Sequence, residues 1–424
     1  MSTSLPATPE RIAAARKAVI SSSIGAALEW FDIIVYASFA VVISANFFPD
    51  GGGGLGLILT FATFAITYLI RPLGAVVLGG YADRHGRKKA LTLTLMLMMV
   101  GTAIMALAPT HATVGGWAGV IILISRLVQG FSAGGEFGTA TTFLVETAPN
   151  RKAYYASWQI ASQGASMLMA SAFGFVLFNT LSHDALYSWG WRIPFFLGIL
   201  IGPVGLYIRA HLSETEEFES APRSKAPIRA TFTHHLGRVL VSSACIGVAT
   251  ITVYMILYMP TFAVKNLHVP AQAAYLGGVV AGLIALVVVP FVGLLADRVG
   301  PAKVMLWSAV VTLIVAWPLF QLMVSAPSVF TLILVIAILG VIMAFYFGPL
   351  PAMLTEMFPS DVRTTGVSAA YNIGVTLLGG IAPLVLTWLI DITGSLKAPG
   401  LYYMVIAVIS LIGLILARRV YQAR

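Results

Sequence analysis

The chain alternates between long apolar runs and short polar loops. A helix of about 20 apolar residues crosses the hydrocarbon core of a bilayer, so each run predicts a membrane-spanning helix. We predict an all-α membrane protein in which twelve transmembrane helices form two pseudo-symmetric halves of six helices each. The predicted spans cover residues 18–47, 55–81, 89–109, 114–145, 153–180, 187–210, 237–263, 270–296, 302–324, 328–350, 365–390 and 399–418.

The polar loops repeat from one half to the other. The pattern G-x-x-A-D-R-x-G occurs twice, around Asp83 and Asp297, which are 214 residues apart. Glu146 and Glu356 each precede a proline and an arginine, at an offset of 210 in a chain of 424 residues. The chain therefore contains two copies of one half. Paired halves with a central site between them are a common plan of secondary transporters.

The composition agrees with a membrane protein. The sequence is 58% hydrophobic and 10% charged, with a mean hydropathy of +0.91, which leaves too little polar surface for a soluble globule of 45 kDa. Twenty of the 25 Lys and Arg residues fall on one side of the predicted layout, which the positive-inside rule assigns to the cytoplasm. The net charge of +9 thus reflects topology and indicates no nucleic-acid partner. We expect a multi-pass membrane protein with both termini in the cytoplasm.

The layout divides the chain into segments. The first 17 residues lack the short apolar core and cleavage site of a signal peptide, so we expect a cytoplasmic leader. The spacing of Ser213 and Glu216 is a capping-box pattern and predicts a short amphipathic helix between the halves. The expected segments are a leader at 1–17, a six-helix bundle at 18–210, a cytoplasmic linker at 211–236, a second six-helix bundle at 237–418 and a cytoplasmic tail at 419–424.

The residue types argue against several kinds of chemistry. Cys245 is the one cysteine, and the seven histidines fall at loops or helix ends without ligand spacing, so we expect no disulfide, metal site or cofactor. A channel would show rings of like residues, and a membrane enzyme would show a nucleophile or a metal cluster. We expect a monomeric transporter of a small solute and protons. A membrane sensor without transport is a distant alternative.

Five ionisable residues fall in the middle of predicted spans, where each costs at least about 2.5 to 3.5 kcal/mol at the bilayer centre. They are Glu29, Asp32, Arg71, Arg126 and Glu136, all in the first half. A carboxyl group in a dehydrated cavity cycles between its protonated and charged forms, whereas a guanidinium group keeps its proton. We therefore predict that Asp32 and Glu136 carry the proton, with Glu29 as a further candidate. Purely structural neutralisation of the two arginines is the alternative.

Further polar residues within the spans predict a polar cavity. Tyr36 shares one helix face with Glu29 and Asp32. Arg71 and Arg126 are suited to an anion because a guanidinium fork binds both oxygens of a carboxylate. Interhelical hydrogen bonds also use such polar residues, so each has a structural alternative. The predicted substrate-binding residues are Arg71, Arg126, Tyr36, Gln159, Gln163, Tyr254, Tyr258, Tyr371 and Asn372.

Several motifs carry a resemblance to a known family. Residues 79–91 resemble the G-x-L-A-D-R-x-G-R-K-x-x-L loop of the major facilitator superfamily, and R-L-V-Q-G at 126–130 resembles its R-x-x-Q-G motif. The segments similar to the metabolite:proton symporters within that superfamily are L-E-W-F-D at 28–32, I-R-P-L-G at 70–74, G-F-S-A-G-G-E at 130–136 and W-G-W-R-I-P-F at 189–195. The resemblance implies alternating access, with two six-helix halves rocking around a midplane cavity.

The resemblance also implies a cytoplasmic gate. In the family, the aspartate that corresponds to Asp83 accepts hydrogen bonds from the start of span 11, here near Thr364 or Thr365, and holds the gate shut. The second loop reads P-A-K at 301–303 where two basic residues are expected, which indicates a weaker latch. A loop that only anchors topology is the alternative. The expected gate residues are Asp83, Arg84, Arg87, Asp297, Arg298, Glu146, Glu356 and Arg363.

The resemblance points to two different classes of substrate, a carboxylate and a zwitterion. S-W-Q-I-A-S-Q at 157–163 looks like the citrate branch, whereas Y-M-I-L-Y-M-P-T at 254–261 and K-N-L-H at 265–268 look like the proline and glycine betaine branch. The chain lacks the long charged tail expected of osmosensing members, which favours a carboxylate. Span 5 lacks the G-P-x-x-G-G pattern of antiporters, which favours symport. We expect proton symport of citrate, another tricarboxylate or a dicarboxylate, with a zwitterionic osmolyte as the alternative.

Overall fold

The computed structural model describes residues 9–49, 55–148, 150–210, 227–269 and 271–423, almost all of them in helices. The first half contains α1 (Pro9–Ser38), α2 (Ala40–Phe47), α3 (Leu55–His85), α4 (Arg87–Leu107), α5 (His111–Val114), α6 (Trp117–Thr147), α7 (Lys152–Thr180), α8 (His183–Ser188), η1 (Gly190–Arg192) and α9 (Ile193–Ala210). The second half contains α11 (Pro227–His234), α12 (Leu236–Cys245), α13 (Gly247–Leu267), α14 (Ala271–Val299), α15 (Pro301–Ser325), α16 (Val329–Phe347), α17 (Leu350–Glu356), α18 (Arg363–Val375), η2 (Thr376–Gly380), α19 (Ala382–Thr393) and α20 (Ala398–Val420).

The predicted twelve-helix architecture is confirmed. Eleven spans in the described part of the chain are long and apolar enough to cross a membrane, and α12 and α13, bent by 40° at their junction, form a twelfth when counted together. The ends of two helices differ from the predicted bounds. α1 begins at Pro9, before the predicted first span, and the tenth span stops at Phe347 and resumes as α17. Pro349 and Pro351 explain this break, because a proline lacks the N–H of a continuous helix.

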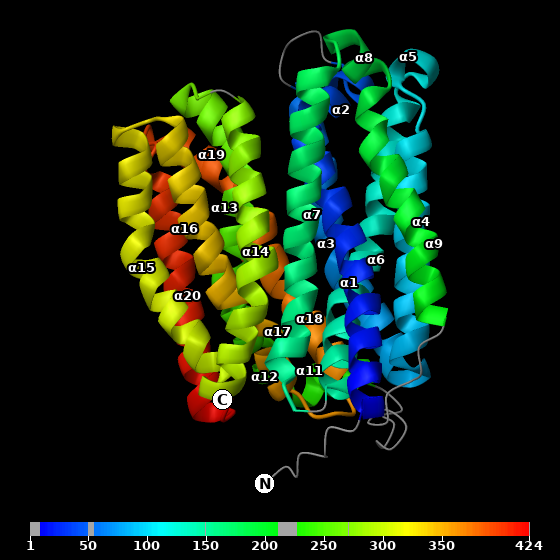
Figure 1. Ribbon diagram of the computed structural model, residues 1–424, viewed down its shortest axis with the longest axis vertical. Helices are drawn as coiled ribbons and strands as arrows, with labels where there is room; N and C mark the ends of the chain where they lie inside the picture. The colour runs from blue at the N-terminus through cyan, green and yellow to red at the C-terminus, as the bar shows by residue number, and fades with distance from the viewer. Residues whose placement is uncertain (1–8, 50–54, 149, 211–226, 270, 424) are drawn as a thin grey trace.

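The segment between the halves is described from residue 227 onward. The helix predicted near Ser213 lies outside the described residues. The predicted linker also contains α11, which the sequence reasoning did not anticipate. Its residue Ile228 packs against Gly80 of α3, where a Cβ on Gly80 would lie 3.0 Å from the Ile228 side chain. This short helix therefore touches the first half at the end where the chain crosses to the second half (Figure 1).

The two G-x-x-A-D-R-x-G loops fold in the same way. Gly86, between α3 and α4, has a φ of 106°, and Gly300, between α14 and α15, has a φ of 105°. Residues with a Cβ rarely adopt this conformation. The last glycine of each motif is therefore needed to reverse the chain between two adjacent spans, and the repeat in the sequence is a repeat in backbone geometry.

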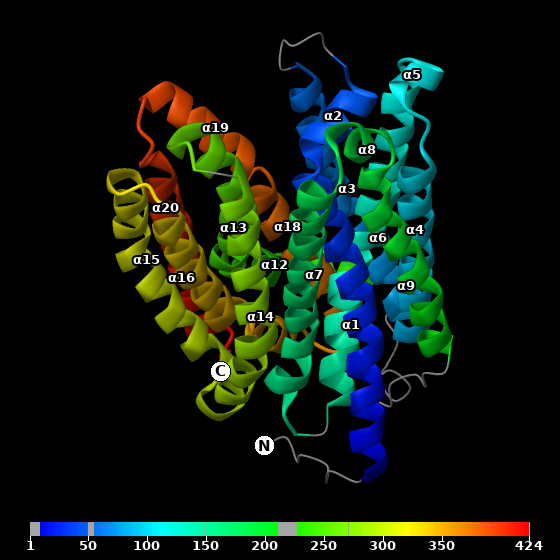
Figure 2. The same cartoon turned by 45° about the horizontal axis from the view of Figure 1, so that its top comes forward.

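The two halves meet along α7 and α14, which lie side by side in Figure 1 and again in the tilted view of Figure 2. Small residues allow this close approach. A Cβ on Gly164 would lie 2.6 Å from the Cβ of Ala285, and a Cβ on Gly282 would lie 2.6 Å from the backbone nitrogen of Leu168. A second contact joins α3 and α6 to α18. These contacts place α3 and α6, which carry the buried arginines, at the boundary between the halves.

The outer surface is apolar and the interior contains charges. Trp307, Phe330 and Leu384 are among many large apolar side chains that are exposed. In contrast, Arg71 and Arg126 are among the largest fully buried side chains. This distribution fits a protein whose outside meets lipid tails and whose polar groups face its own interior.

Candidate transport site

Glu29 and Asp32 lie one turn apart on α1, and each pairs with an arginine. Arg71 Nη2 on α3 lies 3.1 Å from Glu29 Oε1, and Arg126 Nη1 on α6 donates to Asp32 Oδ2 at 2.8 Å. All four side chains are buried. Attraction between opposite charges is strong in a low-dielectric interior and offsets part of the cost of removing them from water. Four of the five acids and arginines singled out from the sequence are thus brought together as two separate pairs.

Tyr36, one turn beyond Asp32, supports Arg126. The guanidinium carbon of Arg126 lies 4.0 Å from the centre of the Tyr36 ring, close enough for attraction between the cation and the ring face. The Tyr36 hydroxyl lies 2.6 Å from Thr63 Oγ1, which itself donates to the carbonyl of Thr60 at 2.8 Å. The Tyr36 hydroxyl also lies 3.3 Å from the Thr60 carbonyl, so either hydroxyl can donate in the bond that Tyr36 and Thr63 share. Arg126 is therefore fixed by a carboxylate and by an aromatic ring.

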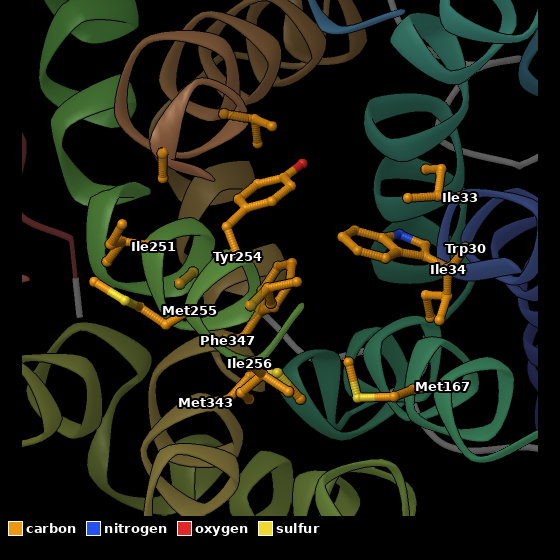
Figure 3. Close-up of a cluster of buried hydrophobic side chains, with 14 of the residues drawn as sticks. Trp30, Ile33, Ile34, Met167, Ile251, Tyr254, Met255, Ile256, Met343 and Phe347 are labelled. Carbon is orange, nitrogen blue, oxygen red and sulfur yellow. The ribbon is translucent and has the colours of Figure 1, made fainter. Parts of the chain in front are cut away.

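Arg71 is supported in the same way by Tyr68, a residue that the sequence reasoning missed. Their separation is 4.4 Å from the guanidinium carbon to the ring centre. The Tyr68 ring meets the ring of Tyr254 on α13 edge to face, with centroids 5.4 Å apart. Figure 3 shows Tyr254 and Phe347 of the second half opposite Trp30 of the first. The spacing of three residues between Tyr68 and Arg71 was the available signal, because such residues share a helix face.

Two residues on other helices orient Asp32. Thr102 Oγ1 on α4 donates to Asp32 Oδ1 at 3.2 Å, and Gln129 Nε2 donates to Thr102 Oγ1 at 3.1 Å. Gln129 is the glutamine of the R-x-x-Q-G motif. The motif thus supplies the cation that pairs with Asp32 and the amide that positions Thr102. Neither Thr102 nor Gln129 was among the predicted site residues.

Glu136 lies on α6 and is hydrogen-bonded to Thr94 of α4. Ser132 Oγ donates to the carbonyl of Thr94 at 2.5 Å. Glu136 also acts electrostatically on Glu29. Two of the three mid-span acids are therefore close enough for their charges to interact.

The predicted glutamines and the second tyrosine of α13 have different surroundings. Gln159 on α7 accepts a hydrogen bond from Thr141 Oγ1 of α6 at 2.8 Å, and Gln163 is buried one turn further along α7. The Tyr258 hydroxyl lies 3.3 Å from Thr387 Oγ1 on α19. Tyr258 is thus engaged within the second half, one turn away from Tyr254.

Tyr371 and Asn372 of α18 contact the first half directly. The Tyr371 ring stacks on the ring of Phe137, with centroids 3.4 Å apart and planes 6° from parallel. Asn372 Nδ2 donates to the carbonyl of Gly134 at 2.8 Å. Both predicted residues therefore lie where α18 packs on α6.

Several buried donors near the arginines have no acceptor. Within the described residues, Arg71 Nε and Arg126 Nε and Nη2 are buried without a hydrogen-bond partner, and the buried hydroxyls of Tyr68 and Tyr254 have none beyond each other. Each such group costs about 1 to 3 kcal/mol. A cluster of them marks a place where a polar ligand can supply the missing acceptors. Among the described residues, no group of three or more His, Cys, Asp or Glu side chains could hold a metal ion.

The contact expected between Asp83 and span 11 is present. The backbone nitrogen and Oγ1 of Thr365, at the start of α18, donate to Asp83 Oδ2 at 2.9 Å and 2.6 Å. The start of a helix carries N–H groups without helical partners and a partial positive charge, so it favours a carboxylate. Arg87 Nη2 lies 3.6 Å from Asp83 Oδ1. Asp83 therefore links the first half to a helix of the second.

An ion-pair cluster adds to this link. Glu146 Oε1 lies 3.2 Å from Arg87 Nη2 and 3.2 Å from Arg363 Nη1, and Arg363 belongs to the second half. The Glu146 side chain is fully buried. The other predicted gate residues on this side, Arg84, Arg298 and Glu356, are exposed.

Asp297 makes the reciprocal contact. Its two carboxylate oxygens accept hydrogen bonds from the backbone nitrogens of Ala153 and Tyr154, at 2.8 Å and 3.0 Å. These nitrogens lie at the start of α7, in the first half. Each half thus places its repeated aspartate on the start of a helix in the other half.

The fold and these contacts define a membrane transporter built from two repeated six-helix bundles. The family model of the Sugar (and other) transporter matches residues 18–225, and that of the Major Facilitator Superfamily matches residues 278–424. A citrate-proton symporter of Klebsiella pneumoniae is 38% identical over 397 residues, which cover 92% of this chain and 89% of that protein. The chain belongs to the major facilitator superfamily.

Two further comparisons bear on substrate and fold. A proline/betaine transporter of Escherichia coli (strain K12) is 34% identical over 414 residues, which cover 94% of this chain and 82% of that protein. The proton:xylose symporter XylE, solved with bound 6-bromo-6-deoxy-D-glucose, has a TM-score of 0.81 over 97% of this chain and 96% of its own, at 15% identity. That likeness shows the shared fold. The relatives divide between a carboxylate and zwitterions, as the sequence motifs do.

Proposed function

We propose that this chain is a proton-coupled symporter that imports a small organic carboxylate, namely citrate, another tricarboxylate or a dicarboxylate. One observation carries the proposal: Arg71 and Arg126 are buried and keep N–H donors without acceptors among the described residues. Such a guanidinium group binds a carboxylate through charge-assisted hydrogen bonds. The citrate-proton symporters of Klebsiella pneumoniae and Salmonella typhi, 38% and 36% identical to this chain, support the same class.

In this proposal the acids carry the proton because they compete with the substrate for the arginines. A substrate carboxylate that binds Arg126 takes the place of Asp32, and a displaced carboxylate in a buried site is stabilised by protonation. Proton binding and substrate binding therefore favour each other, as symport requires. Glu29 stands in the same relation to Arg71. Glu136 is hydrogen-bonded to Thr94, and we propose it as a carrier with Asp32 because its carboxyl group is buried in the same half. Gln159, Gln163, Tyr371 and Asn372 are proposed to line the substrate path.

A zwitterionic osmolyte such as proline or glycine betaine is the second candidate, since proline/betaine transporters of Salmonella typhimurium and Escherichia coli are 35% and 34% identical. Its ammonium group would need an aromatic face. One face of Tyr36 is taken by Arg126, and one face of Tyr68 is taken by Arg71. A second cation near these rings would meet like charge. This arrangement favours the carboxylate.

We also propose that the contacts of Asp83 and Asp297 close the transporter toward the cytoplasm. The support is that both aspartates bind helix starts across the boundary between the halves, with Arg87, Glu146 and Arg363 alongside Asp83. Opening toward the cytoplasm would break these contacts as the halves rock. Arg84, Arg298 and Glu356 are proposed as outlying members of the same gate.

The proposed setting is the inner membrane of a bacterium, with both termini and the segment between the bundles in the cytoplasm. The asymmetric distribution of Lys and Arg supports this orientation. One chain contains both halves, so we propose that a monomer is the functional unit. The proposed division keeps a first bundle to residue 210 and a second bundle from residue 237.

Uptake of labelled citrate into proteoliposomes tests the proposal. Uptake should rise as the external pH falls, should collapse with a protonophore, and should be inhibited by tricarballylate or a dicarboxylate. Accumulation that follows a sodium gradient and ignores the protonophore would refute proton coupling. Inhibition by proline or betaine alone would select the second candidate. No uptake of either class would leave a membrane sensor as the function.

A further inference from the structure

We propose that the hydroxyls of Tyr68 and Tyr254 are a pair of substrate-binding donors, one from each half, that hold the carboxylate bound at Arg71. The inference rests on the proposed carboxylate symport and deepens it. It adds Tyr68 to the site and assigns a shared task to two residues on opposite sides of the boundary.

The first argument is the state of the two hydroxyls. Both side chains are 1% exposed, and the two hydroxyls interact with each other, but neither has a hydrogen-bond partner outside this pair among the described residues. Other buried tyrosines do: Tyr346 donates to the carbonyl of Cys245 at 2.7 Å, and Tyr403 lies 2.6 Å from Thr252 Oγ1. At most one of the two O–H groups can donate to the other, so at least one buried O–H is left without an acceptor, an exception that a ligand would explain.

The second argument is the neighbour that they share. Arg71 lies over the Tyr68 ring and interacts electrostatically with Tyr254, and its Nε has no acceptor among the described residues. These three donors, one of them cationic, thus have no acceptor beyond the two phenol oxygens themselves. The ligand that satisfies them is an acceptor with negative charge, as a carboxylate is. The ammonium group of a zwitterion offers no such acceptor, although its carboxylate does.

The third argument is that Tyr68 is held in place from the second half. Thr376 Oγ1, in the π-helical turn η2, donates to the Tyr68 carbonyl at 2.9 Å. A Cβ on Gly380 of the same turn would lie 2.9 Å from the Tyr68 ring. The ring is therefore oriented before any ligand arrives, which reduces the entropy lost on binding.

The consequence concerns closure around the substrate. Tyr68 belongs to α3 and Tyr254 to α13, and Figure 3 shows Tyr254 facing the first half from among the side chains of the second. A carboxylate that accepts from both hydroxyls connects the two halves at the depth of Arg71. The occupied transporter would then favour the conformation in which both phenols reach the ligand.

The test compares Tyr68→Phe and Tyr254→Phe with Tyr403→Phe, which also removes one buried phenol hydroxyl but lies outside the proposed site. Each variant is reconstituted, and the KM and kcat of citrate uptake are measured together with the thermal stabilisation that citrate gives the purified protein. A lost hydrogen bond to a charged group weakens binding by about 10- to 100-fold. We expect KM to rise by that factor in each site variant, with kcat changed less and stabilisation by citrate reduced. Tyr403→Phe should keep the wild-type KM.

The outcomes separate this inference from the proposed function. Wild-type protein that imports no carboxylate would overturn both. Wild-type uptake with an unchanged KM in Tyr68→Phe and Tyr254→Phe would overturn only the donor pair. An equal loss in all three variants would mean that the phenols act through packing. If Tyr68→Phe does not fold, Tyr254→Phe decides alone, because it removes the donor from the other half.

Discussion

The two halves of the molecule share a framework but differ in chemistry. Both contain the G-x-x-A-D-R-x-G loop, both use a glycine with positive φ to end it, and both place its aspartate on the start of a helix in the opposite half. Among the described residues, however, every buried Asp, Glu, Arg or Lys belongs to the first half. The repeat therefore preserves turns and latches, whereas the charged interior is confined to one copy.

The positions equivalent to the charges show what replaces them. At the offset of 214 Arg71 corresponds to Ala285, and at the offset of 210 Arg126 corresponds to Ile336. Ala285 packs where Gly164 of α7 approaches α14, and Ile336 packs against Gly277. The second half thus uses these positions for close helix packing. A charge costs several kcal/mol in a membrane interior, so we expect a buried charge only in the half where it has a function.

The largest expected effect comes from changing matched positions of the two halves. Arg126→Lys keeps the positive charge but removes the planar fork that pairs with Asp32 and is proposed to bind the substrate. We expect kcat/KM for citrate to fall by about 100-fold, the scale of a charge-assisted hydrogen bond lost from a buried site. Ile336→Val, at the equivalent position, should cost about 0.5 to 1.5 kcal/mol of stability and leave kcat/KM nearly unchanged.

Uptake assays and thermal unfolding of both variants provide the measurement. If Arg126→Lys transports as well as Ile336→Val, the charged cluster is structural and the functional contrast between the halves disappears. Equal losses in both variants would indicate that general packing of the bundles controls transport.

The same contrast explains which features the sequence could predict. The sequence could predict the spans, the repeat and the loops because the length of an apolar run and the repeated glycine and aspartate are local features of the chain. The pairing of α1 with α3 and α6 was only partly readable: mid-span charges indicate that partners exist, but not that Glu29 takes Arg71 while Asp32 takes Arg126. That choice depends on how the helices pack.

Neutral residues of the site were the hardest to find. Thr102 and Tyr68 gain their importance from a hydrogen bond to Asp32 and from contact with Arg71, and threonine and tyrosine are common in any membrane helix. Glu146 and Glu356 occupy repeated positions, and this repeat wrongly suggested that their surroundings are alike. The sequence treats them alike, but Glu146 is buried between two arginines and Glu356 is exposed.

A smaller effect is expected from a variant of the first half that uncouples proton transport from substrate transport. Asp32→Asn removes a proposed proton carrier but leaves the arginines. Each coupled proton contributes about 1.4 kcal/mol per pH unit of gradient, or about tenfold in accumulation. In the variant, citrate accumulation driven by a gradient of one pH unit should therefore fall about tenfold. The exchange of internal for external citrate should be retained. Counterflow and net uptake on the same liposomes measure the two quantities. Equal loss of both would assign Asp32 to substrate binding, and loss of neither would leave Glu136 as the carrier.

The balance between the cytoplasm-closed and cytoplasm-open states should distinguish the two latches. Asp83 is buried beside Arg87, whereas Asp297 is partly exposed, and a charge at a helix start is worth up to about 2 kcal/mol when buried and about 0.3 to 1 kcal/mol when exposed. Asp83→Asn should therefore shift the balance toward the cytoplasm-open state by up to about 30-fold, and Asp297→Asn by about two- to fivefold. A cysteine at Ser368, buried one turn behind the Asp83 contact, reports this opening through its labelling rate in a Cys245→Ser background. The two effects should multiply in the double variant if the latches act independently. Unchanged labelling with normal transport in both single variants would reduce the repeated loops to signals for topology.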